Sequence, residues 1–154
     1  MIIKLKAFTL VEVILTVTIL MIGIGAGVSW TLQAINSVEL QSATESVVSL
    51  VRNAQAAAQK NYEDKNQGIF LESNKYSYFM GDSYDLSAAE DRQEFELPQG
   101  IEIAEVNLNG GLEEIVFQKG KGDTEEYGSF KLLHSASGDY FTVSIFPLGL
   151  IDFE

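Results

Sequence analysis

One long uncharged stretch near the N-terminus limits what this chain can fold into more than any other feature. Between Phe8 and Val38 the only ionisable side chain is Glu12, and the run from Val13 to Trp30 is almost entirely apolar or small. A helix that crosses hydrocarbon needs about 20 mostly apolar residues. Lys4 and Lys6 precede the run, as expected on the cytoplasmic side of a membrane. The sequence therefore predicts a single-pass protein of the cytoplasmic (inner) membrane with its C-terminal part outside the cytoplasm.

The apolar stretch is followed by an amphipathic pattern. No proline interrupts the chain from Phe8 to Lys60, so residues 8–61 are predicted to form one helix of about 80 Å, transmembrane in its first half. Apolar and small residues recur at three-and-four spacing, which indicates a face that packs on a folded domain. These residues are Leu32, Ile35, Val38, Ala43, Val47, Leu50, Val51, Ala54 and Ala58.

Two features of the apolar run have more than one interpretation. The small residues Gly25, Ala26 and Gly27 are also compatible with a cleaved secretory signal peptide, although Glu12 and the continuing helical pattern argue against it. Gly23, Gly25 and Gly27 weaken a helix interior by up to about 1 kcal/mol each relative to alanine. They indicate either a place where the helix loosens or a face for close helix packing.

The rest of the chain changes to the two-residue period of β-strands, so the fold class is predicted to be α+β. Residues 62–154 are expected to form a small antiparallel β-sheet domain packed on the helix. Tight-turn residues such as Asn109-Gly110 separate the strands. The predicted strands are Gly68–Glu72, Lys75–Met80, Glu94–Leu97, Ile101–Leu108, Glu114–Phe117, Ser129–His134, Tyr140–Phe146 and Leu150–Phe153.

Charge and composition exclude several functional classes. The net charge of −12 opposes direct binding of nucleic acid, and the absence of cysteine excludes disulfides and thiol chemistry. His134 is the only histidine and is expected to be structural, so the sequence predicts no enzyme, no cofactor and no metal centre. Two acidic stretches, around Asp82 to Asp91 and Asp123 to Glu126, fit solvated loops better than Ca²⁺ sites.

The residues at the start of the chain resemble a known processing motif. KAFTLVE, from Lys6 to Glu12, directly before an apolar run, resembles the cleavage and methylation motif of type IV prepilins and pseudopilins. The resemblance implies a leader of residues 1–7, cleavage by prepilin peptidase between Ala7 and Phe8, and N-methylation of Phe8. The family usually has glycine before the cut, where this chain has Ala7. The resemblance also implies that Glu12 acts in subunit assembly by pairing with the free amine of a neighbouring subunit.

A looser resemblance extends over residues 47–152. An arginine near the helix end, a hairpin with Tyr76 and Tyr78, the segment Leu97 to Ile101 and a terminal pair of hairpins are similar in order to the GspH/FimT group of minor pseudopilins and minor pilins. This resemblance favours a minor subunit over a major one.

Together, the two resemblances predict a minor pilin or pseudopilin of a type IV pilus or a type II secretion pseudopilus. The implied partners are other pilins or pseudopilins in a filament, prepilin peptidase, the inner-membrane assembly platform and membrane lipid. Type II secretion, pilus assembly and competence remain alternatives, because the N-terminal pattern of a basic leader, a glutamate and an apolar helix fits all three systems. Alternatives of other classes are an unprocessed single-pass anchor carrying a binding or adhesin domain, and a membrane-tethered enzyme.

Overall fold

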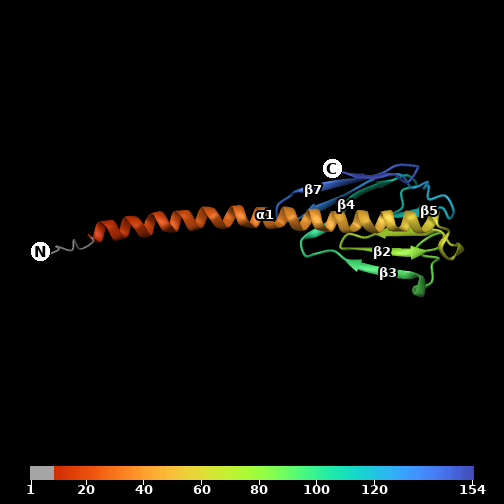
Figure 1. Cartoon of the computed structure of the whole chain (residues 1–154), viewed down its shortest axis with the longest axis horizontal. Helices are drawn as coiled ribbons and strands as arrows, with labels where there is room; N and C mark the ends of the chain where they lie inside the picture. Colours follow the sequence, from red (N-terminus) through yellow and green to blue (C-terminus); the bar gives the residue numbers. More distant parts are fainter. Residues whose placement is uncertain (1–8) are drawn as a thin grey trace, which may run out of the picture. The chain divides into compact units, whose positions relative to one another are not determined.

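The N-terminal part of the chain is one continuous helix. The computed structural model describes residues 9–154, and for residues 25–33 the backbone alone. Helix α1 runs from Leu10 to Gln59, 50 residues without interruption (Figure 1). The chain divides into two compact units, residues 1–35 and 36–154.

The membrane-spanning part of the prediction is wrong. Among the residues that the structure describes, no helix combines the length and the apolar character needed to cross a membrane. This finding corrects both the transmembrane first half of the helix and the single-pass inner-membrane location.

Residues 36–154 contain all the strands. The eight predicted strands are confirmed, and each end lies within two residues of its predicted position. The strands are β1 (Gln67–Leu71), β2 (Lys75–Met80), β3 (Arg92–Glu96), β4 (Ile101–Leu108), β5 (Glu114–Phe117), β6 (Gly128–His134), β7 (Tyr140–Ile145) and β8 (Ile151–Phe153). Short 3-10 turns lie at Tyr62–Asp64 and Ala89–Asp91.

The strands form two antiparallel sheets rather than one. The first sheet has the order β3-β2-β1-β5 and the second has the order β4-β6-β7-β8. Strand β5 follows β4 of the second sheet in the sequence, but it pairs with β1 and forms an edge of the first sheet. The sheets meet where the Ile103 backbone N–H of β4 donates to the Ser73 carbonyl of the β1–β2 turn, at 2.8 Å.

The core lies between the second half of α1 and the two sheets (Figure 1). The predicted helix face is confirmed at Ala43, Val47, Val51, Ala54 and Ala58, which are all buried. The predicted face is wrong at Ile35 and Val38, which are exposed, and the side chain of Leu32 lies outside the described part of the structure. The sheets contribute Ile69, Phe117, Phe130 and Val143, none of which retains measurable exposure.

Helix α1 ends against a loop that is distant in sequence. Asn61 adopts the left-handed conformation typical of a residue just after a helix, with φ of 53°. The Ala58 carbonyl at the helix end accepts from the Asn61 backbone N–H at 2.9 Å and from the Gly120 backbone N–H at 2.7 Å. The β5–β6 connection therefore fixes the end of the helix.

The first sheet has a covered outer face. The Tyr84 ring stacks on Phe70 at 4.2 Å between centroids, and the Arg92 guanidinium lies 4.3 Å from the Tyr84 ring centroid. Arg92 also donates to the carbonyls of Tyr84 and Ser87. These contacts hold the segment between β2 and β3 against the sheet, with Phe79 completely buried beneath it.

The position of the core predicts how much of the helix can be removed. Because the first core side chain is Leu40, a chain that starts at residue 28 keeps every core residue. A start at Arg52 would remove Leu40, Ala43, Val47, Val48 and Val51 from that core. We expect the 28–154 chain to be folded and monodisperse, with a mixed helix and strand circular dichroism spectrum and a cooperative thermal transition. An aggregated or unfolded 28–154 chain would show that the boundary is misplaced.

Candidate functional site

The predicted processing site lies at the edge of the described structure. Ala7 and Phe8, the predicted cleavage site and the predicted N-methylated residue, lie outside the described residues. Glu12, the predicted assembly residue, is described and lies in the first turn of α1. The structure therefore locates one of the three predicted site residues, together with the start of the helix that follows the predicted cut.

Thr9 begins this helix as its N-cap. The Glu12 backbone N–H donates to the Thr9 side-chain oxygen at 3.3 Å and to the Thr9 carbonyl at 3.0 Å. Thr9 and Glu12 have the T-x-x-E spacing of a capping box, in which an N-cap threonine is paired with a glutamate three residues later. The capping role of Thr9 was not predicted from the sequence, where Glu12 was expected to act in assembly alone, although the T-x-x-E spacing is a recognisable signal.

The carboxylate of Glu12 is exposed in the single chain. Within the described part of the chain, none of the salt bridges involves Glu12. A carboxylate in the first turn of a helix is stabilised by the helix dipole, typically by about 0.3–1 kcal/mol. Glu12 therefore has a local role in helix formation and remains available for a cation from outside the described residues.

The helix surface after Glu12 is apolar on all sides. The threonine hydroxyls in this stretch donate back to helix carbonyls, Thr16 to Glu12 at 2.7 Å and Thr18 to Ile14 at 2.8 Å, so they leave little polar surface. Exposure ranges from 45% at Val17 to 75% at Leu10. The exposed large apolar residues are Leu10, Val11, Val13, Ile14, Leu15, Val17, Ile19, Leu20, Met21, Ile22 and Ile24.

This apolar surface, residues 10–24, is called the assembly segment below. A helix that is hydrophobic all round is normally buried, because apolar surface is stabilised by about 25 cal/mol for each Å² removed from water. Neighbouring helices packed around such a segment would bury it and would surround Glu12 at its first turn. The segment is therefore suited to helix–helix association.

Several side chains in the two acidic stretches contact other groups of the protein. Asp91 forms a salt bridge with Lys65 at 2.7 Å, and Asp82 accepts a hydrogen bond from the Asn66 amide at 2.8 Å. In the second stretch, Glu126 accepts from the Val116 backbone N–H and from the Thr124 hydroxyl. Among the described residues there is no group of three or more acidic or histidine side chains placed to hold a metal ion.

His134 has a structural contact at the end of β6. It is almost fully buried, and its Nδ1 accepts a hydrogen bond from the Ser137 backbone N–H at 3.3 Å. The Gly138 backbone N–H in turn donates to the His134 carbonyl at 2.8 Å. These bonds shape the β6–β7 turn.

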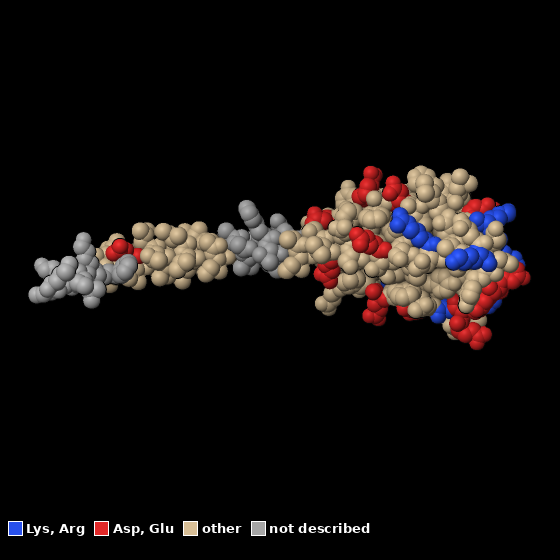
Figure 2. Space-filling view, viewed as in Figure 1, with Lys and Arg blue, Asp and Glu red and all other residues tan. Residues whose placement is uncertain are grey.

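The surface of residues 36–154 is predominantly acidic. Figure 2 shows carboxylates distributed over the visible face of this unit, with lysine and arginine side chains between them. Several of these bases are paired, as in the salt bridges Lys131–Glu105 at 2.6 Å and Lys119–Asp64 at 2.9 Å. Lys119 also lowers the pKa of Asp64, through its hydrogen bond and its charge.

Comparison with known proteins does not assign this arrangement to a family. No family model, no curated protein and no solved structure matches the chain.

Proposed function

We propose that this protein is a filament subunit of the type IV pilin-like class, a minor pilin or pseudopilin, that assembles through its N-terminal helix. In this proposal prepilin peptidase cuts between Ala7 and Phe8, and the new amine of Phe8 is methylated. The processed subunit then joins other subunits through the assembly segment, and residues 36–154 provide the surface specific to this subunit.

The observation that carries the proposal is the assembly segment itself. Side chains from Leu10 to Ile24 are apolar and exposed around the whole helix, and Glu12 is the only ionisable residue among them. Apolar surface of this extent on one chain is unfavourable in water, so it needs partners. The helix of 50 residues that carries this segment begins at Leu10, two residues after Phe8, which follows the predicted cut. Its position at the new N-terminus suits it to pack against copies of itself.

The proposed role is structural rather than catalytic. Nucleophilic catalysis needs a nucleophile and a base within hydrogen-bond reach, with the base oriented by a third group. The single histidine, His134, instead contacts the backbone of Ser137 in a turn. In the acidic stretches, Asp91, Asp82 and Glu126 contact a lysine, an amide and a backbone N–H, respectively.

N-terminal processing is the direct test. We expect protein from cells that contain prepilin peptidase to begin at Phe8, with an intact mass that includes one added methyl group. Protein from cells that lack the peptidase should retain Met1. Intact-mass spectrometry and N-terminal sequencing distinguish these products, and an Ala7→Gly chain should be cut at least as completely as the natural one.

Other N-termini contradict the proposal in different ways. A chain that begins at Met1 in cells with active peptidase indicates an unprocessed protein whose C-terminal unit acts as a binding domain. A chain that begins after Gly27 indicates a cleaved secretory signal peptide. Neither product would retain both a free amine at Phe8 and Glu12.

A further inference from the structure

A groove lies beside the last turns of α1, and nothing in the proposed function uses it. It has a volume of about 420 Å³ and lies between α1 and the first sheet. Leu50, Ala56 and Ala57 supply an apolar helix side. The volume is within the range of small-molecule sites, about 300–1,000 Å³. Its helix side spans about 15 Å, because residues 50 to 60 rise by 1.5 Å each.

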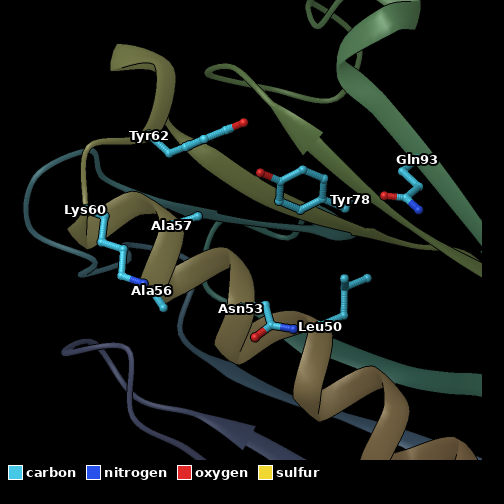
Figure 3. A pocket seen from close by; sticks show the side chains of 8 residues that line it. All are labelled: Leu50, Asn53, Ala56, Ala57, Lys60, Tyr62, Tyr78 and Gln93. Atoms are coloured by element: carbon cyan, nitrogen blue, oxygen red, sulfur yellow. The ribbon is translucent and has the colours of Figure 1, made fainter.

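Two tyrosines and three polar side chains line the groove. Figure 3 shows Tyr62 and Tyr78 extending into the same space, with Asn53 on α1, Lys60 directly after α1 and Gln93 on β3 around it. The Asn53 and Gln93 amides make no hydrogen bond with the described part of the chain. Their donors and acceptors therefore face solvent and are available to a ligand.

The tyrosine side of the groove is held by a buried glutamine. Gln67 is completely buried, and its amide donates to the carbonyls of Tyr62 and Lys65, each at 3.1 Å. Its side-chain oxygen accepts a hydrogen bond from the Tyr78 hydroxyl. Burial raises the pKa of Tyr78, so this hydroxyl stays protonated and keeps donating at neutral pH. The groove is thus formed before any ligand arrives, which lowers the entropic cost of binding.

The lining indicates the chemistry of the ligand. Aromatic faces accept the C–H surface of a sugar ring, and amides match hydroxyl groups because both donate and accept hydrogen bonds. Lys60 is the only charged side chain that lines the groove, in a chain whose net charge is −12. A negative group that lies next to Lys60 would therefore be attracted to it, against the overall negative charge of the chain.

We propose that this groove binds a short oligosaccharide, with an acidic sugar unit next to Lys60 and sugar rings against Tyr62 and Tyr78. The proposal does not depend on filament assembly, because every lining residue belongs to one chain.

The test uses the full chain in a zwitterionic detergent without sugar head groups, which covers the assembly segment. Isothermal titration calorimetry with tetragalacturonate and with neutral cellotetraose should show binding of both, with the acidic probe bound about tenfold more tightly. Tyr62→Ala should weaken both probes about tenfold. Lys60→Met should remove the preference for the acidic probe and leave the neutral affinity unchanged.

Matched controls and a peptide probe make the test decisive. Tyr127→Ala and Lys121→Met change an exposed tyrosine and an exposed lysine outside the groove and should leave both affinities unchanged. The proposal is overturned if neither tetrasaccharide binds at millimolar concentration, or if the controls weaken binding as much as the groove variants do. It is also overturned if tetra-aspartate binds as tightly as tetragalacturonate, because the groove would then respond only to negative charge.

Discussion

Replacing Glu12 is expected to remove this protein from filaments while leaving its folding and cleavage intact. In the proposed assembly, packing of neighbouring segments takes the Glu12 carboxylate out of water, and the amine of Phe8 on an adjacent subunit neutralises it. Removing one member of a buried ion pair leaves the other charge uncompensated, which costs about 3–5 kcal/mol. We therefore expect Glu12→Gln and Glu12→Val to reduce the amount in sheared filaments at least tenfold relative to the natural chain.

The two variants separate assembly from helix capping. Glutamine also serves at the third helical position of a capping box, so Glu12→Gln removes the charge and preserves the cap, whereas Glu12→Val removes both. Glu45 provides the matched control, because it is an exposed carboxylate on the same helix and accepts from the Gln41 amide at 2.9 Å. Glu45→Gln should assemble normally. Normal amounts of both Glu12 variants in filaments would show that the Glu12 charge has no part in assembly.

Gly128→Ala is expected to be the most damaging small substitution in the β-rich unit. Gly128 begins β6 with φ of 149°, a conformation that residues with a side chain rarely adopt, and an added Cβ would lie 2.1 Å from the Asn107 carbonyl oxygen. That oxygen belongs to the backbone of the paired strand β4 and cannot move aside without disturbing the sheet. Backbone strain and overpacking together predict a loss of about 3 kcal/mol in unfolding free energy.

Gly138→Ala isolates the steric part of this effect. Gly138 also has positive φ, 76°, but an added Cβ would meet nothing within 4 Å. It should therefore lose only the conformational contribution, about 1 kcal/mol. Thermal unfolding followed by circular dichroism should show a Tm about 12 °C lower for Gly128→Ala and about 4 °C lower for Gly138→Ala. Equal shifts would mean that the Asn107 contact relaxes at little cost.

Local pattern alone was enough to predict the elements of this fold. Alternating apolar residues such as those of β7, bounded by turn residues, predicted all eight strands. The three-and-four spacing predicted that Val47, Val51 and Ala54 face the core. These predictions succeed because backbone period and side-chain direction are coupled within a few residues of sequence. The T-x-x-E spacing of Thr9 and Glu12 is equally local and also predicts the start of the helix.

Tertiary structure decided how these elements combine. The division into two sheets, the pairing of β5 with β1 and the capping of α1 by Gly120 join segments that are distant in sequence. The groove depends in the same way on Gln67, which links Tyr62 to Tyr78. Hydrophobic pattern shows only that a face must be buried and not which surface covers it, because the hydrophobic effect has no direction. For the same reason, the apolar character of residues 10–24 shows that they need a partner but does not by itself identify it.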